Sequence, residues 1–279
     1  MLLRTTVLIT RLLMPILLCF LASCPYQVIA QHQNQAVILQ YHHVSTQTPP
    51  ITSLSPEAFY THMDYLDENG FSVLPLQDVI ASLRNGDLLP DKTAVITFDD
   101  GYTSVFEAAY PALKARGWPF TIFVTTGLVG SNDRLYSSWE QIREMASAGA
   151  TVANHTVSHP YLIRHNGASE AEWLQSVEAE IMGAEDTIMR ETGQQHKLLA
   201  YPYGEYNLPI QTLVNTLGFV GIGQHSGPIN NNSDFTALSR FPFSGIYASM
   251  NSFPNKVMSL AFTLDSISPT SPITSSPSP

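Results

Sequence analysis

The fold of this chain is decided by the stretch TAVITFDDG, residues 93–101. Its first six residues are apolar or β-branched, which is typical of a buried strand. Asp99 and Asp100 follow directly, and Gly101 permits a turn into a segment with helical periodicity at 104–116. A buried strand that ends in two acids delivers their carboxylates to the edge of a sheet or barrel, where catalytic groups usually lie.

The same order of strand, helix and glycine repeats along the chain. Six consecutive units of this kind predict parallel strands joined by helices. Because seven strands are recognisable, we expect an α/β fold, a single-domain distorted (β/α)7 barrel, with a doubly wound open sheet as the alternative. The predicted strands are 36–41, 72–76, 93–98, 120–125, 150–154, 197–201 and 219–224, and the predicted helices are 56–69, 76–85, 104–116, 138–148, 169–192 and 207–217.

Two histidines follow the predicted strand at 150–154. His155 and His159 are four residues apart, so both imidazoles can face one side of a turn. Together with Asp100 they form a set of one carboxylate and two imidazoles, which suits a catalytic divalent metal ion and leaves a position open for water. Asp99 is then free to act as a base. The alternative is that the acids cap the next helix and the histidines are ordinary surface residues.

Three further stretches lie at predicted strand ends. The turn YPYG, residues 201–204, offers Tyr201, Pro202 and Tyr203 for contact with sugar rings, and can also direct a backbone amide. Its alternative interpretation is a tight turn with half-buried tyrosines. His42 ends the first strand and His225 ends the seventh. Each either reaches the site or is a hydrogen-bonded residue of the barrel rim.

The first 30 residues are predicted to be an export signal. Arg4 and Arg11 precede or flank an apolar run at 12–22 that is too short for a comfortable membrane span. Cleavage after Ala30 is one outcome. The alternative is a lipoprotein signal cut before Cys24, which would then carry a lipid anchor. We expect a secreted, periplasmic or outer-membrane-anchored protein with its catalytic domain at 31–264 and a disordered Ser/Thr/Pro-rich tail at 265–279.

Composition narrows the classes of partner and chemistry. The net charge of −10 and the absence of a basic stripe argue against nucleic acid as a partner. Both cysteines, Cys19 and Cys24, lie in the leader, so a thiol nucleophile, a thiolate metal site and a disulfide are excluded from the mature domain. We expect a monomer.

The motifs of this chain resemble those of a known family. TFDDG at 97–101 and HTVSH at 155–159 look like the first two motifs of polysaccharide deacetylases, the NodB-homology domain of carbohydrate esterase family four, and YPYG at 201–204 is similar to the third. YHHV at 41–44 and YPYGEY at 201–206 are similar to the branch that deacetylates poly-N-acetylglucosamine. The resemblance spans roughly residues 36–245.

This resemblance implies a mechanism for a site at the barrel rim. Asp100, His155 and His159 would hold one divalent metal ion, zinc in first place, with cobalt or nickel as alternatives. Asp99 would be the base that activates water, and the backbone amide of Tyr203 would help to stabilise the oxyanion. The substrate would be a glycan that contains N-acetylglucosamine, with acetate as the product.

The chain departs from the family pattern in two places. Ala200 stands where the family carries an arginine that orients the base, so we expect Asp99 to lack its usual cationic partner. The histidine of the fifth motif is not recognisable after residue 225. We therefore predict that His42 supplies the general acid, with His225 as second choice. The alternative functions are an acetyl-ester hydrolase acting on acetylated xylan and a catalytically weak glycan-binding barrel.

Overall fold

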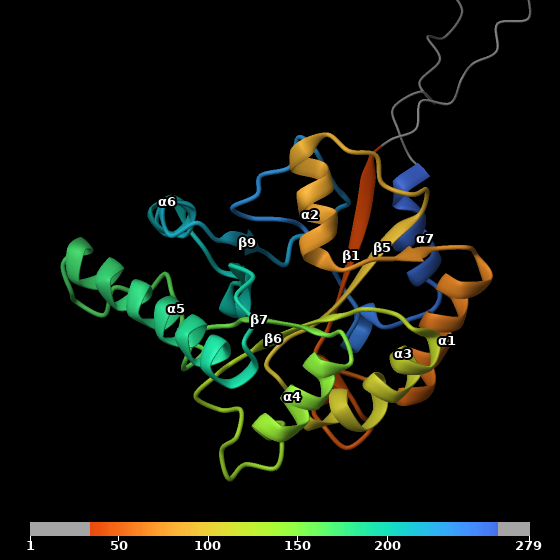
Figure 1. The fold of residues 1–279 in the computed structure, drawn as a ribbon, viewed down its shortest axis with the longest axis horizontal. Helices are drawn as coiled ribbons and strands as arrows, with labels where there is room; N and C mark the ends of the chain where they lie inside the picture. Colours follow the sequence, from red (N-terminus) through yellow and green to blue (C-terminus); the bar gives the residue numbers. More distant parts are fainter. Residues whose placement is uncertain (1–33, 262–279) are drawn as a thin grey trace, which may run out of the picture. The chain divides into compact units, whose positions relative to one another are not determined.

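The computed structural model describes residues 34–261 as a set of central strands with helices arranged round them (Figure 1). The predicted leader with Cys24 and the predicted tail at 265–279 lie outside the described residues. None of the helices within 34–261 is both long enough and apolar enough to cross a membrane.

Nine strands form one sheet in the order β10-β1-β5-β6-β7-β8-β9, with β11 added to β1 and β4 added to β5. Neighbouring strands are parallel except for β10, which is antiparallel to β1. The strands are β1 (Gln35–Tyr41), β4 (Ser72–Val73), β5 (Thr93–Phe98), β6 (Thr121–Val124), β7 (Thr151–Asn154), β8 (Leu198–Ala200), β9 (Val220–Ile222), β10 (Ile229–Asn230) and β11 (Phe241–Pro242), beside a separate pair β2 (His43–Val44) and β3 (Ser53–Leu54).

The segment 235–242 connects the last strand of this sheet to the first. Leu238 forms a parallel bridge with Ile222 beside β9, and its amide donates to the carbonyl of Gly221 (2.8 Å). Three residues later, Phe241 in β11 pairs with Leu39 in β1. The sheet thus curls round on itself with an irregular seam, which confirms the predicted distorted (β/α)7 barrel.

Seven α-helices connect or flank the strands. Ser138 and Ser169 each begin a helix with a capping box, and glycines in the left-handed conformation end α2, α3 and α5, as the sequence predicts. The helices are α1 (Pro56–Glu68), α2 (Leu76–Asn85), α3 (Tyr110–Arg116), preceded by the π-helical turn η2 (Val105–Ala109), α4 (Trp139–Ser147), α5 (Glu170–Thr192), α6 (Leu208–Thr216) and α7 (Phe253–Val257). Short 3-10 turns are η1 (Pro50–Thr52), η3 (Pro202–Gly204), η4 (Gly245–Tyr247) and η5 (Met258–Ala261).

The predicted strand at 72–76 is wrong in length and in position. Only Ser72 and Val73 pair with β5, and they lie off the main path of the sheet, because β1 pairs with β5 directly over six residues. Pro75 explains the early end, since it has no amide to donate to a neighbouring strand and it precedes the first residue of α2.

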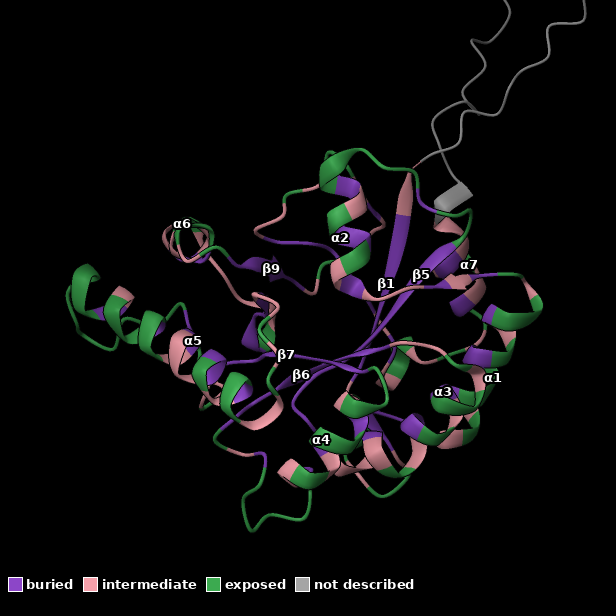
Figure 2. Cartoon of the chain, viewed as in Figure 1, coloured by how far each residue is buried: buried purple, intermediate pink, exposed green. Residues whose placement is uncertain are grey.

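Side-chain alternation along the strands separates two apolar layers. Ile38 and Val95 belong to an inner cluster that also contains Val79 of α2, so this helix packs against the inside of the barrel. Leu39 and Ile96 belong instead to the outer cluster, against α1 and α3. Figure 2 shows the central strands as buried almost throughout. Successive side chains along a strand point to opposite faces. Residues 40 and 42 at the end of β1, and residues 97 and 99 at the end of β5, are therefore expected to point to the inside of the barrel at its carboxyl end.

The outer cluster contains a buried histidine that couples stability to pH. His62 is fully buried, a hydrogen bond joins its Nδ1 to Tyr41 Oη (3.1 Å), and its ring stacks on Phe253 at 3.9 Å. Burial lowers the pKa of His62 from 6.5 to about 4. Between these pH values the unfolded chain binds a proton that the folded protein does not, so stability falls as the pH is lowered from 6.5 to 4.

We expect His62→Gln to reduce this acid sensitivity. The fall in the free energy of unfolding between pH 7 and pH 4 should be smaller by about 3 kcal/mol in the variant, because the glutamine does not titrate. Urea unfolding at the two pH values measures the difference. If the free energy of unfolding falls equally in the wild-type and variant proteins, protonation of His62 does not destabilise the folded protein.

Candidate active site

Asp99 is clamped inside the barrel by an arginine. Arg240 Nη1 donates to Asp99 Oδ1 (2.7 Å), Arg240 Nη2 donates to Oδ2 (2.8 Å), and Gln40 Nε2 donates to Oδ2 as well (2.7 Å). Both ion-pair partners are fully buried. Burial by itself raises the pKa of Asp99, but the charges of Arg240, His155 and His42 outweigh it and bring the pKa to about 2. Asp99 is therefore a carboxylate at neutral pH.

Arg240 comes from the segment that closes the barrel, and its place corrects a prediction. Its Nε donates to the carbonyl of Gly223 (2.9 Å) and its Nη1 approaches Thr97 Oγ1 (3.3 Å). The expectation that Asp99 lacks a cationic partner is wrong. Ala200 does leave the inner face of β8 without an arginine. The guanidinium comes instead from the seam segment 235–242 and lies 5.6 Å from the centre of the Phe123 ring.

Asp100, His155 and His159 meet at the carboxyl ends of β5 and β7. One potential ligand atom from each lies within 4.8 Å of the others. His155 Nε2 is 3.3 Å and His159 Nε2 3.4 Å from Asp100 Oδ1. Burial by itself raises the pKa of Asp100. The hydrogen bond with His155 and the charge of His155 outweigh burial, so the pKa of this carboxyl group lies well below its usual range. The sequence prediction that these three side chains come together is confirmed.

The neighbours of His155 suit metal binding. Its Nδ1 lies 2.8 Å from the carbonyl oxygen of Ala200, which can only accept, so Nδ1 carries the proton. When the imidazole is neutral, the lone pair is then on Nε2, which faces Asp100, and this is the tautomer that a metal-binding histidine needs. The donor set and its orientation therefore fit a divalent cation.

The backbone is strained in the motifs TFDDG, HTVSH and YPYG. Four non-glycine residues of these motifs adopt a positive φ: Asp100 (73°), Thr156 (68°), His159 (56°) and Tyr203 (59°). Such conformations cost free energy and persist where the surrounding structure holds them. The next residue after Asp100 is Gly101, where a Cβ would lie 2.7 Å from Val129 Cγ2, so a side chain does not fit at this turn.

Glu180 of α5 holds the loop between the two histidines. Its Oε2 accepts from the amides of Val157 (3.0 Å) and Ser158 (2.9 Å), and its Oε1 accepts from Ser158 Oγ (2.8 Å). Within the loop, the amide of His159 donates to Thr156 Oγ1 (3.1 Å). These bonds fix the path of the backbone from His155 to His159.

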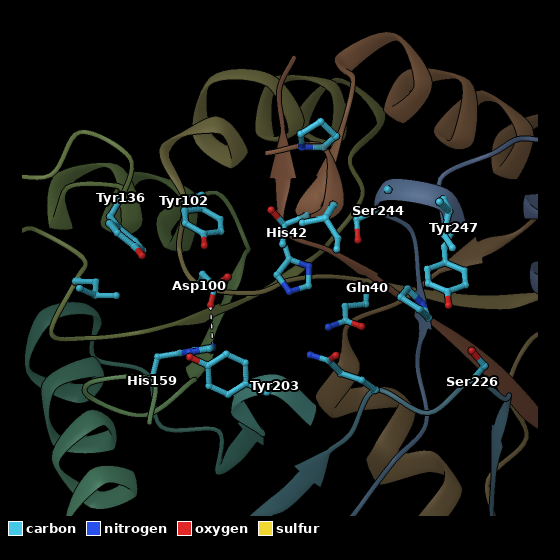
Figure 3. A pocket seen from close by; sticks show the side chains of 18 of the residues that line it. Gln40, His42, Asp100, Tyr102, Tyr136, His159, Tyr203, Ser226, Ser244 and Tyr247 are labelled. Carbon is cyan, nitrogen blue, oxygen red and sulfur yellow. Dashed lines mark ion pairs between the residues drawn. The ribbon is translucent and has the colours of Figure 1, made fainter. Parts of the chain in front are cut away.

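A cavity of about 1340 Å³ opens over these groups (Figure 3). His42, Asp100 and His159 all line it, and His42 Nε2 lies 3.9 Å from Asp99 Oδ2. The predicted acid and two of the predicted metal ligands thus line one cavity, while Asp99 and His155 are buried next to it, in contact with His42 and Asp100. Its lining consists of Gln40, His42, Pro50, Ile51, Thr52, Asp100, Tyr102, Leu128, Tyr136, Ser158, His159, Tyr203, Gln224, Ser226, Pro242, Ser244, Gly245, Ile246 and Tyr247.

The other predicted site residues divide between rim and core. Tyr203 lines the cavity with its ring flat against Tyr161 (4.0 Å) and edge-on to His159 (4.4 Å). Tyr201 is fully buried and donates to the carbonyl of Thr236 (2.7 Å), and Pro202 is buried too. Neither lines the cavity, so the prediction that they contact substrate is not carried further.

His225 lies next to the cavity without lining it. It is exposed, its Nδ1 lies 3.4 Å from Tyr206 Oη, and its neighbours Gln224 and Ser226 line the cavity. Of the two predicted candidates for the general acid, His42 is the one that lines the cavity.

Sequence analysis missed two aromatic residues and an amide of the site. Tyr102 and Tyr136 line the cavity with ring centres 5.1 Å apart, and His43 stacks on Tyr102 at 3.5 Å. Tyr102 directly follows the TFDDG motif, which is a signal that could have found it. Gln40 could have been found from alternation along the first strand. Tyr136 lies in a loop without a pattern.

Comparison with known proteins identifies the domain. Residues 87–222 match the sequence profile of a family described as polysaccharide deacetylase. The chain contains a polysaccharide deacetylase domain. The sequence-based recognition of this family is confirmed, and the chain has enzymes of this family among its relatives.

Two relatives and one solved structure show the extent of the similarity. A Bacillus subtilis (strain 168) protein named "Putative polysaccharide deacetylase YxkH" is 29% identical over 73% of this chain and 69% of its own length. The poly-beta-1,6-N-acetyl-D-glucosamine N-deacetylase of Escherichia coli (strain K12) is 24% identical over 62% of this chain, which matches only 31% of that protein. The structure of Streptococcus pyogenes deacetylase PplD in complex with acetate shares the fold, with a TM-score of 0.71 and 24% identity over 80% of this chain and 98% of that one.

We expect Arg240→Met to destabilise this deacetylase domain by about 3–5 kcal/mol, because the variant leaves the Asp99 carboxylate buried without its partner. Urea unfolding at pH 7 measures the loss. Adding Asp99→Asn should recover part of it, since the uncompensated charge is then gone. Arg190→Met is the control: Arg190 pairs with Glu191 at the surface, and its loss should cost no more than about 0.5 kcal/mol. Equal stabilities of Arg240→Met and Arg190→Met would contradict the clamp.

Proposed function

We propose that this protein is a metal-dependent hydrolase that removes N-acetyl groups from an N-acetylglucosamine-containing polysaccharide or oligosaccharide and releases acetate. The observation that carries the proposal is the group Asp100, His155 and His159 beside the Arg240-clamped carboxylate of Asp99, next to a cavity that His42, Asp100 and His159 line. The family of the domain supports the deacetylation, and the Escherichia coli relative supports N-acetylglucosamine as the sugar.

Asp100, His155 and His159 would hold one divalent ion, with zinc proposed and cobalt or nickel as alternatives. When bound, such an ion polarises the acetyl carbonyl and lowers the pKa of water. Asp99 accepts the proton that water loses as its oxygen attacks the carbonyl carbon. Arg240 and Gln40 keep the carboxylate of Asp99 ionised and in a fixed orientation for this step.

His42 completes the proton transfers. The C–N bond of the acetamide breaks only if the leaving nitrogen gains a proton, because an amide anion is a very poor leaving group. His42 lines the cavity 3.9 Å from Asp99 Oδ2, so it can give its proton to the nitrogen and recover one from Asp99. The backbone amide of Tyr203 is proposed as a donor to the developing oxyanion.

The two alternative functions have less support. The binding-only barrel rested on the missing arginine at Ala200, and Arg240 now supplies that charge. Hydrolysis of acetyl esters on xylan has a weaker need for a general acid, and the position of His42 in the cavity lining supports the amide as substrate. We further propose, from the leader sequence, that the protein acts outside the cytoplasm.

Acetate release tests the proposal. The protein, freed of metal by chelation, is incubated with N-acetylglucosamine oligomers with and without zinc, cobalt or nickel. We expect release to return with metal and to be absent in Asp99→Asn under every condition. Release from acetylated xylan but from no N-acetylglucosamine oligomer would favour the esterase, and silence on both substrates would leave a binding barrel.

We expect His42→Ala to lower kcat for the oligomers by about 10²–10⁴, the range found when a general acid is lost. The loss should be much smaller with an activated acetyl ester, because its leaving group needs no proton. His225→Ala, outside the cavity, should keep kcat within about twofold and serves as the control. An equal loss on amide and ester would show that His42 does something other than protonate the leaving group.

We expect Glu180→Ala to weaken zinc binding about 10–100-fold, because the loop between the two histidines loses its support. Competition with a chelating dye measures the affinity without any substrate. Glu180→Gln, which keeps an acceptor for the two amides, should retain most of the affinity. Glu178→Ala, an exposed position of the same helix, is the control. Unchanged affinity in Glu180→Ala would mean that the loop is held by its other contacts.

A further inference from the structure

Two 3-10 turns from distant parts of the chain build one wall of the cavity. η1 and η4 touch closely: a Cβ on Gly245 would lie only 3.1 Å from the carbonyl oxygen of Ile51. Figure 3 shows Tyr247 across the cavity from Asp100 and His159, with His42 between them. This wall, the η1–η4 wall, is defined here by Ile51, Ile246 and Tyr247, and it has no part in the chemistry proposed above.

The η1–η4 wall is unusually exposed for its composition. The accessible fractions are 79% for Ile51, 86% for Ile246 and 52% for Tyr247. Of the eleven large apolar residues that are exposed within 34–261, these three and Tyr203 line the same cavity. Exposed apolar side chains that gather at a concave site mark a binding surface.

The chemistry of the lining selects an uncharged ligand. Among the residues that line the cavity, Asp100 is the only carboxylate, and no lysine or arginine is present. Four amides and hydroxyls also line the cavity, namely Gln40, Gln224, Ser226 and Ser244. A sugar ring matches this arrangement, since it offers an apolar C–H face to Tyr247 or an isoleucine and hydroxyl groups to the amides.

The size of the cavity points to more than one sugar. Its volume of about 1340 Å³ exceeds the roughly 300–1,000 Å³ of ordinary small-molecule pockets. Tyr247 is also held from behind: Lys256 Nζ lies 5.1 Å from the centre of its ring and donates to the carbonyl of Pro242 (3.0 Å). A lipid surface fits less well, because Lys256 is the cation beside the wall, it is already engaged, and the chain carries a net charge of −10.

We propose that the η1–η4 wall is a subsite for a second sugar ring of an uncharged glycan, adjacent to the ring that loses its acetyl group. The proposal rests on the proposed function in that the glycan is the substrate. Its consequence is a preference for oligomers over a single sugar, because only an oligomer reaches from Asp100 to Tyr247.

Steady-state kinetics on N-acetylglucosamine oligomers of one to five units test the subsite. In Tyr247→Ala and in Ile246→Ser, we expect KM for the pentamer to rise about tenfold with kcat unchanged, as for loss of one well-placed contact. KM for the single sugar should stay the same. Leu88→Ser and Leu208→Ser are matched controls, since both leucines are exposed (76% and 74%) and neither lines the cavity. Equal KM values for the pentamer in wild-type and wall variants would overturn the subsite and leave the deacetylase standing.

Binding measurements separate the two proposals. Calorimetric titration of Asp99→Asn protein with the pentamer needs no turnover, so it reports on the subsite even if no acetate is ever released. Weaker binding after adding Tyr247→Ala supports the subsite, and unchanged binding overturns it. Vesicles of phosphatidylcholine and phosphatidylglycerol serve as the competing probe. If Ile246→Ser abolishes vesicle binding while pentamer affinity is unchanged, the wall contacts membranes and the sugar subsite is wrong.

Discussion

The ion pair between Asp99 and Arg240 is the interaction on which the rest of this structure depends. A carboxylate with no exposed surface would be neutral in an apolar barrel, and a neutral carboxyl group cannot take a proton from water. The bidentate guanidinium keeps it charged, and the same residue belongs to the segment that joins β9 to β1. The segment that closes the barrel is thus also the segment that holds the Asp99 carboxylate in its charged form.

The rest of the site is built on a rigid apolar support. Ile38 and Val95 lie directly below Gln40 and Thr97 on the same inner faces, Asp99 lies one step above Thr97, and α2 packs against the apolar layer. The strained backbone at Asp100 and His159 is tolerated because this support and the hydrogen bonds of Glu180 hold it. The three side chains that could hold a metal ion are therefore held in position by the protein itself.

Local patterns predicted much of this architecture and part of the site. Period-two strands, helix-ending glycines and the TFDDG and HTVSH motifs were sufficient for the barrel and for the meeting of Asp100 with the histidines. Arg240 could not be found in this way, because its partner is 141 residues distant and nothing in its neighbourhood encodes the contact. Ala200 and its expected consequence were misleading for the same reason. Tyr201 was a different kind of error: since Ala200 faces inward, alternation already places Tyr201 on the outer side, towards α5 and α6.

Because the seam at 235–242 lies near the end of the barrel sequence, the Asp99–Arg240 ion pair can form only late in synthesis. Asp99 leaves the ribosome long before Arg240, so the nascent barrel must keep this carboxylate in contact with water until the final segment arrives. A fragment limited to residues 87–222, the part that matches the family profile, would carry Asp100, His155 and His159 but neither β1 nor the arginine. Such a fragment would contain the three candidate metal ligands and Asp99 without the guanidinium that holds the Asp99 carboxylate inside the closed barrel, so the functional unit is longer than the part that matches the family profile.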